Sequence, residues 1–186
     1  MSNRSESLLN PDRNYYVIKE KLWDWGSGDI YDESGATIGR MKRKLLSLRA
    51  EITVDEPDGL PILTVNRKIA SVRRSYDIKD ANGNLLGRTR KKLLTLFKPR
   101  MWMEDQNADK ILVGQGSFAG WDFEISDIHG RKLAEVSKSE RWRDIFLGGV
   151  FDYSDTYTLH ILDQSYDKRA LLGFVIAIDN SVHDKR

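Results

Sequence analysis

The apolar run that begins at Ala170 limits most strictly what this chain can fold into. Residues Ala170 to Ile178, within the segment KRALLGFVIAIDN, are nine in number and carry no polar side chain. Successive residues of an α-helix are about 100° apart, so this run covers the whole circumference and leaves no face for water. Its rise of about 13 Å is too short to cross a bilayer. The run therefore predicts a helix, at about residues 167–183, that is enclosed on every side by its own protein.

The same helix has an alternative interpretation as an anchor that is extruded into a membrane. Extrusion would abandon roughly 10–25 kcal/mol of gross burial, at about 1.5–3 kcal/mol for each large side chain. Lys168, Arg169 and Asp179 flank the run, so a longer span would carry charge into the hydrocarbon. We therefore expect the helix to form the core through its large apolar side chains, which are Leu171, Leu172, Phe174, Val175, Ile176 and Ile178.

The chain before the helix has the pattern of antiparallel β structure. From Tyr15 onward, segments rich in Val, Ile, Tyr and Thr alternate with turn clusters such as DESG, EPDG, DANG and DIHG. Residues 30–48, IYDESGATIGRMKRKLLSL, align without a gap on residues 78–96, IKDANGNLLGRTRKKLLTL. The repeated unit is a hairpin with an Asx-Gly turn. We expect twelve strands, and a mainly β fold in which an antiparallel barrel closes around the hydrophobic C-terminal α-helix.

Period-two alternation sorts the second strand of each repeat into two faces. Gly39 and Met41 in one copy occupy the positions of Gly87 and Thr89 in the other. We expect this face to point inward, where small residues let the wall approach the helix. The opposite face carries cations, which predict two outward basic rows: Arg40, Lys42 and Lys44 in the first copy, and Arg88, Arg90 and Lys92 in the second.

Length and composition indicate one domain. The chain has 186 residues, of which 40% are hydrophobic, enough for a single sizeable core. Residues 1–14 are polar and predict a flexible N-terminal arm, and residues 15–186 then form one barrel domain. The polar N-terminus and the lack of cysteine lead us to expect a cytoplasmic location, peripheral to the membrane if the protein binds one.

The segment Ser139–Asp152, SERWRDIFLGGVFD, interrupts the strand pattern with a group of large apolar residues. It either plugs one end of the barrel or projects from it. Monomeric proteins seldom leave large apolar patches exposed, so the plug is the interpretation we favour.

These features together resemble the LURP-one-related family. The resemblance rests on the repeated D-x-x-G and K-L-L hairpins, on the strand DTYTLHI at Asp155–Ile161, and on the terminal run LLGFVIAIDN at Leu171–Asn180. It covers roughly Tyr15 to Asp184. The domain of this family belongs with the C-terminal domains of tubby proteins and with the phospholipid scramblases. The resemblance implies a twelve-stranded tubby-like barrel around a hydrophobic helix, in agreement with the residues themselves.

The resemblance says less about function. Tubby domains bind phosphoinositide headgroups through basic residues of the barrel, but no local motif assigns such a residue to a numbered position here. Scramblases typically carry a cysteine-rich palmitoylated segment and an acidic segment linked to calcium. This chain has no cysteine, and the loop DQSYDKR before the helix is only weakly acidic. The departure argues against lipid scrambling.

Other candidate sites fail on spacing. The segment 80–84, DANGN, superficially resembles an EF-hand loop, but the sixth and twelfth positions counted from Asp80 are Leu85 and Lys91 rather than Gly and a carboxylate. We expect a hairpin turn there. No pair among the histidines has metal-binding spacing, and no nucleophile has a partnering base in reach. The net charge of +2 gives no case for nucleic acid. We expect a protein that is no enzyme and takes no cofactor, metal ion or nucleic acid.

Two interpretations of the basic rows stay open. In the first, the rows bind anionic phospholipid headgroups at a membrane surface, where each cation contributes about 1 kcal/mol. In the second, they are a solvated outer wall, offset by nearby carboxylates, in a protein-interaction or structural module with an unidentified protein partner. Rows of charge are usually solvated faces, which favours the second interpretation, whereas the resemblance favours the first. An enzyme with a site assembled from scattered residues is a third, weaker alternative.

Overall fold

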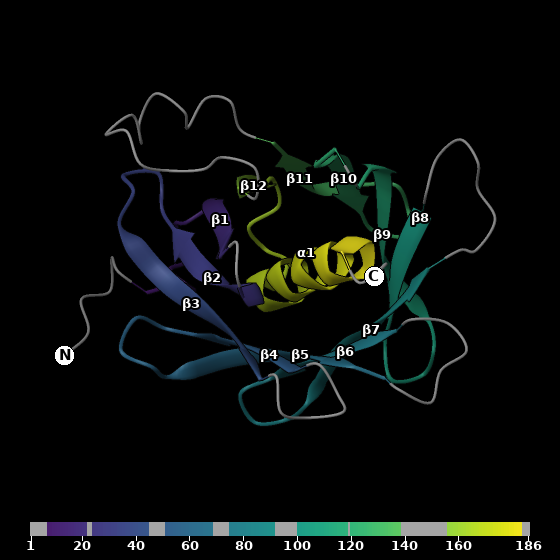
Figure 1. Cartoon of the computed structure of the whole chain (residues 1–186). Helices are drawn as coiled ribbons and strands as arrows, with labels where there is room; N and C mark the ends of the chain where they lie inside the picture. The colour runs from purple at the N-terminus through teal and green to yellow at the C-terminus, as the bar shows by residue number, and fades with distance from the viewer. Residues whose placement is uncertain are drawn as a thin grey trace.

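Antiparallel strands close into a barrel around a C-terminal helix (Figure 1). The computed structural model describes residues 7–21, 24–44, 51–68, 75–91, 100–118, 120–138 and 156–183. Within these ranges there are twelve strands, so the predicted mainly β class, the strand number and the central helix are confirmed. The segment Ser139–Asp152 lies outside the described residues, and so does its predicted role as a plug or a projection.

The strands follow one another around the barrel in sequence order, and β12 pairs with β1 to close it. Their bounds are β1 (Tyr15–Lys21), β2 (Asp24–Tyr31), β3 (Thr37–Lys44), β4 (Glu51–Asp55), β5 (Pro61–Arg67), β6 (Tyr76–Asp80), β7 (Leu85–Lys91), β8 (Arg100–Glu104), β9 (Lys110–Ser117), β10 (Asp122–Ser126), β11 (Lys132–Ser137) and β12 (Thr156–Ile161). The helix α1 spans Lys168–His183. Because neighbouring strands are antiparallel, all connections that leave even-numbered strands lie at one end of the barrel, called the hairpin end below. The connections that leave odd-numbered strands lie at the opposite end.

Tight turns of one geometry join the strands at the hairpin end. In the turn at 80–84, the carboxylate of Asp80 accepts hydrogen bonds from the N–H groups of Asn82 and Asn84 at 2.9 and 2.8 Å. Gly83 has a φ of 85°, a left-handed conformation that glycine adopts without strain. The same pair of carboxylate bonds forms in the turns that begin at Asp32, Asp105 and Asp127. The predicted Asx-Gly turn is therefore confirmed, and its carboxylate is occupied by the backbone.

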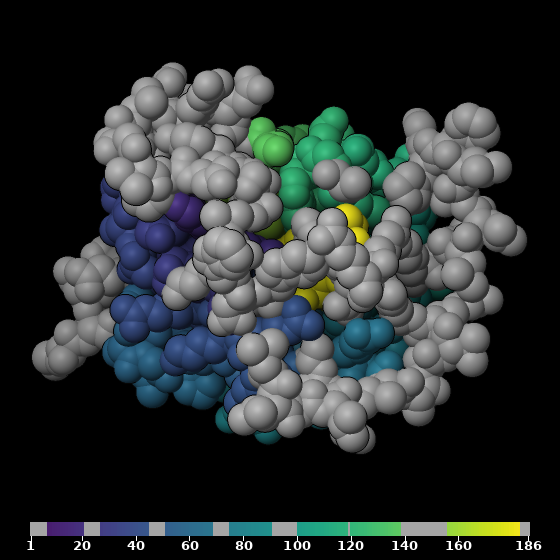
Figure 2. Space-filling model, in the orientation of Figure 1, coloured from purple at the N-terminus to yellow at the C-terminus, as the bar shows by residue number. Residues whose placement is uncertain are grey.

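The apolar run forms the interior of the barrel, as its composition predicts. Asp167 begins the helix, because its carboxylate accepts the N–H of Arg169 at 2.9 Å as an N-cap does. The side chains from Ala170 to Ile178 are all buried. A Cβ added to Gly173 would lie 2.4 Å from Cγ2 of Ile78, so the glycine permits close contact between helix and wall. Figure 2 shows the yellow atoms of α1 at the centre of one face, between blue and green strands.

The small residues of the repeats point inward, but their role differs from the expectation. Met41 and Thr89 are buried, and Oγ1 of Thr89 accepts the N–H of Tyr76 at 3.0 Å. A Cβ added to Gly39 would meet Leu8 at 3.0 Å, and one added to Gly87 would meet Met103 at 2.5 Å. The expectation that these two glycines let the wall approach the helix is therefore wrong, because other side chains fill the space beside them.

The second half of the N-terminal arm packs against the barrel, which differs from the expected flexible arm. Leu8 is 0% exposed and belongs to the core, and its N–H donates to the carboxylate of Glu56 at 2.9 Å. The ammonium of Lys168, at the start of α1, donates to three carbonyl oxygens of the segment at 2.6–2.7 Å, which are those of Asn10, Pro11 and Arg13. One apolar side chain and three carbonyl groups thus fix a stretch that is polar in composition. Residues 1–6 lie outside the described part.

Replacing Phe174 by Asp tests the central-helix assignment. Phe174 is fully buried, so Phe174→Asp places an unpaired charge in the core and should lower the free energy of unfolding by about 4 kcal/mol or more. Leu60 is 62% exposed in a turn, so Leu60→Asp is the matched control and should leave the melting temperature nearly unchanged. Circular dichroism melts compare the two variants. A normally folded Phe174→Asp protein would defeat the assignment.

The turn at 105–109 offers a test of the hairpin geometry. Ala108 has a φ of 68°, where the equivalent residue of the turn at 80–84 is Gly83. A left-handed residue with a Cβ is strained by about 1–2 kcal/mol. Glycine relieves this strain but also raises the chain entropy of the unfolded state, which offsets part of the gain in stability. Ala108→Gly should raise the free energy of unfolding by about 0.5–1 kcal/mol, whereas Gly83→Ala should lower it. Urea denaturation measures both, and a loss of stability in Ala108→Gly would contradict the geometry.

The contact between Lys168 and the N-terminal segment predicts a local loss of order when it is removed. Lys168→Met keeps an unbranched side chain of nearly the same size but leaves three carbonyl groups without their donor, which should reduce stability by about 2–4 kcal/mol. Amide hydrogen exchange in residues 7–14 should accelerate. Arg169→Met is the control, since Arg169 is partly exposed and bonded to Asp167, and it should change stability by less than about 1 kcal/mol. Unchanged exchange in the Lys168→Met protein would refute the role of Lys168.

Candidate functional site

The first predicted basic row lies on the outer face of β3. Arg40, Lys42 and Lys44 are all exposed there. The ammonium of Lys42 lies 2.8 Å from the carboxylate of Asp55, and that of Lys44 lies 2.7 Å from Glu51. Both acids belong to β4, and Arg40 stands between Asp55 and an acid of β2, Asp29, in the strand register. Carboxylates of the neighbouring strands therefore match this row charge for charge.

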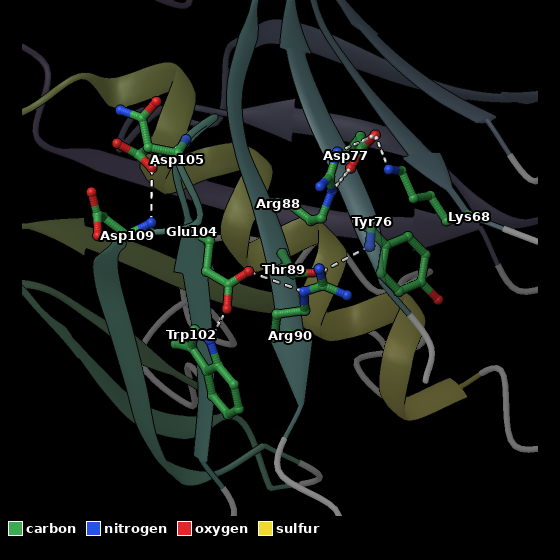
Figure 3. A network of polar contacts seen from close by, with 11 residues as sticks. Lys68, Tyr76, Asp77, Arg88, Thr89, Arg90, Trp102, Glu104, Asp105 and Asp109 are labelled. Carbon is green, nitrogen blue, oxygen red and sulfur yellow. Dashed lines mark hydrogen bonds and ion pairs between the residues drawn. The ribbon is translucent and has the colours of Figure 1, made fainter. Parts of the chain in front are cut away.

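The second row lies on the outer face of β7 and forms part of a larger polar network (Figure 3). Nε of Arg88 lies 2.6 Å from the carboxylate of Asp77 on β6, which also contacts Lys68 at 3.4 Å. Nε of Arg90 lies 3.1 Å from the carboxylate of Glu104 on β8. Lys92 lies outside the described residues.

The two rows do not form one surface. β4, β5 and β6 lie between β3 and β7 in the barrel. Four steps of about 4.8 Å place the rows roughly 19 Å apart around a curved wall. Arg40, Lys42 and Lys44 are thus brought together on one part of the wall, and Arg88 and Arg90 on another.

The surface around β7 keeps an excess of positive charge, unlike that around β3. Seven described side chains of this surface define the β5–β8 patch: Lys68, Asp77, Arg88, Arg90, Arg100, Trp102 and Glu104. The patch contains four cations and two carboxylates. Arg100 is exposed at the start of β8. Positive charge therefore remains on the patch after its ion pairs have formed.

Hydrogen bonds stabilise the charged forms of Glu104 and Arg88 in the β5–β8 patch. Burial alone would raise the pKa of Glu104, but hydrogen bonds from Trp102 and Arg90 outweigh burial and hold this pKa below its usual value. The hydrogen bond with Asp77 raises the pKa of the Arg88 guanidinium above its already high value. The guanidinium groups of Arg88 and Arg90 are thus fixed in position by their carboxylate partners.

Period-two alternation could have located the part of the patch that the sequence analysis missed. In the strand RMWME, Met101 and Met103 are buried, so Arg100, Trp102 and Glu104 face outward. Trp102 lies on the outer wall, where Nζ of Lys110 is 4.9 Å from its ring centroid. Trp121, by contrast, is 5% exposed, and its ring stacks on that of Tyr157 with the centroids 3.9 Å apart.

A polar cavity of about 310 Å³ lies beside the N-terminal segment, at the hairpin end. It is lined by residues 10 and 12–14 of that segment, by Tyr15 at the start of β1 and by 32–34 of the β2–β3 turn. Two of the lining residues, Arg13 and Asp32, form an ion pair at 3.4 Å. Within the ranges given above, no three His, Asp or Glu side chains are grouped as metal ligands would be. The described helix, α1, is not long and apolar enough to span a bilayer.

Comparison with known proteins identifies the family. A family model described as LURP-one-related matches residues 15–179. The X-ray structure of a protein from Arabidopsis thaliana is similar with a TM-score of 0.60 and 11% sequence identity, over 96% of this chain and 99% of that chain. At this identity the likeness concerns the fold alone. No curated protein matches the chain. Since the family match spans nearly the whole barrel and its helix, this chain belongs to the LURP-one-related family.

Proposed function

We propose that the protein binds anionic phospholipid headgroups at a membrane surface, with the β5–β8 patch as the contact. The observation that carries this proposal is the excess of four cations over two carboxylates on that patch. The basic barrel strands through which tubby domains bind phosphoinositides support it by analogy. The β3 row, whose cations are matched by acids of β2 and β4, is a weaker candidate and serves as the internal control.

The ion pairs of the patch do not prevent this binding. A partly exposed ion pair contributes about 0.2–1 kcal/mol, so exchanging a carboxylate for a phosphate oxygen on Arg88 or Arg90 is inexpensive. A planar guanidinium donates two parallel hydrogen bonds to phosphate. At about 1 kcal/mol for each cation near an anionic bilayer, four cations give an affinity in the millimolar range. The binding should therefore be weak, reversible and sensitive to salt.

A protein-interaction or structural module is the second candidate function. The observation that favours it is the pairing of Lys42, Lys44, Arg88 and Arg90 with carboxylates of neighbouring strands. On a solvated outer wall that binds no anionic ligand, such pairing balances the charge of the cations. In that case the protein does not bind vesicles whether or not the charges of the patch are changed, and a protein partner is identified by affinity capture.

Co-flotation with vesicles tests the proposal. The protein should float with vesicles that contain anionic lipid and not with neutral vesicles, more strongly at low than at physiological salt, because the attraction is electrostatic. The double variant Arg88→Glu, Arg90→Glu should reduce the bound fraction at least tenfold. The matched variant Arg40→Glu, Lys42→Glu, on the exposed face of β3, changes net charge equally and should retain most of the binding.

Thermal melts of both double variants verify that the barrel is intact, and Arg88→Gln, Arg90→Gln replaces the first variant if charge reversal beside Asp77 and Glu104 unfolds it. If the protein does not float with anionic vesicles at either salt concentration, the headgroup-binding proposal is wrong and the protein-interaction module is the remaining candidate. Equal loss in the two double variants would remove the β5–β8 patch from the proposal, since net charge alone would then explain the binding.

A further inference from the structure

Acidic residues gather at the hairpin end of the barrel. This end consists of the turns 32–36, 56–60, 80–84, 105–109 and 127–131, the loop 162–169, and the N-terminal segment 7–14, which Lys168 holds there. Together these segments contain eleven acids and four cations. The acids are Asp12, Asp32, Glu33, Glu56, Asp58, Asp80, Asp105, Asp109, Asp127, Asp163 and Asp167, and the cations are Arg13, Arg131, Lys168 and Arg169.

The turn geometry keeps much of this negative charge in place. Asp80 and Asp163 accept hydrogen bonds from turn residues, and those from the side chains of Asn84 and Ser165 hold the pKa of the two carboxyl groups below the usual value. Asp32, Asp105 and Asp127 accept two backbone N–H groups each. The hydrogen bonds that form these turns therefore also favour the charged form of carboxylates such as Asp80 and Asp163.

The rest of the chain carries the opposite sign. The whole sequence contains 30 cations and 28 acids, so the residues outside the hairpin end hold 26 cations and 17 acids. Part of this excess lies at the opposite end. The described side chains of the two terminal residues of each strand there, and of the residues that adjoin them, include seven cations and four acids. The cations are Arg43, Lys44, Arg67, Lys68, Arg90, Arg100 and Lys138.

The two ends are far enough apart to act separately on a charged surface. Strands of eight residues, such as β3 and β9, tilted by about 40°, place the ends roughly 20 Å apart. The Debye length at physiological salt is about 8 Å, so a surface in contact with one end hardly senses the charge of the other. A barrel lying on its side would instead bring acidic turns and basic strand ends to the same surface.

We propose that the barrel docks end-on to an anionic bilayer, with the opposite end against the headgroups and the hairpin end turned away. This inference rests on the proposed function and gives the contact surface its direction. Three cations of the β5–β8 patch, Lys68, Arg90 and Arg100, lie where their strands reach the opposite end. They form the part of the patch that meets the bilayer first, while the acids at the hairpin end oppose any inverted approach.

The lack of cysteine in the chain permits a direct measurement of orientation. Asn107→Cys places one label in the β8–β9 turn, and Ser117→Cys places one at the far end of β9; both residues are exposed. A donor dye on each is excited in the presence of anionic vesicles that carry an acceptor on a headgroup, with neutral vesicles as the baseline. Energy transfer should be at least twofold more efficient from residue 117 than from residue 107.

A pair of charge variants gives a second measurement. Arg100→Gln and Arg131→Gln change net charge equally, but the first is at the opposite end and the second at the hairpin end. Arg100→Gln should lower vesicle partitioning about three- to fivefold, and Arg131→Gln should change it less than twofold.

Equal transfer from the two dye positions, greater transfer from residue 107, or equal effects of the two charge variants would overturn the end-on orientation while leaving headgroup binding intact. Failure of the unmodified protein to bind anionic vesicles would overturn both proposals.

Discussion

A helix without a polar face can be kept from water only by a wall that closes around it, and the size of this wall is fixed by geometry. Twelve strands spaced about 4.8 Å apart and tilted by about 40° give a barrel roughly 24 Å across. Inward side chains occupy the outer part of that width, and the remainder fits a helix of about 10–12 Å. Where the fit is tightest, a glycine allows close contact: Gly173 on the helix lies against Ile78 of the wall, and Gly114 on the wall lies against Phe174 of the helix. The strand number, the hairpin connections and the burial of α1 are thus parts of one packing solution.

The sequence predicted those features that are written locally. The apolar run at Ala170–Ile178 and each duplicated hairpin are short, continuous stretches of sequence. The helix, the turns and the outward direction of Arg88 and Arg90 could therefore be deduced from the sequence. Leu8 could not, because one apolar residue in a polar stretch has no periodicity. Lys168 was taken only as a flanking charge, since its bond to Asn10 joins residues 158 positions apart. Contacts of this kind depend on barrel closure, which no local pattern encodes.

The candidate site has the same limit. Alternation places cations on the outer faces of β3 and β7, but the partners Asp77 and Glu104 and the separation of the two rows follow from strand order. Cross-strand ion pairs hold the guanidinium groups in fixed positions and neutralise part of their charge at once. What distinguishes the β5–β8 patch from the β3 row is therefore the balance of charge on adjoining strands rather than the number of cations on one strand. The helix dipole of α1, positive at the hairpin end, is well placed beside the acids there.

The order of elements along the chain has a consequence for how the protein is made. All twelve described strands precede α1, and a ribosome therefore synthesises the wall before the helix that fills it. β1 finds its second neighbour only when β12 is complete, and the N-terminal segment finds its ammonium partner only with Lys168. Until then the growing chain exposes inward apolar faces and an unpaired strand edge, which are the features that chaperones recognise and that favour aggregation. Cooperative folding must therefore await the synthesis of α1, so a chain terminated before α1 should form no stable barrel.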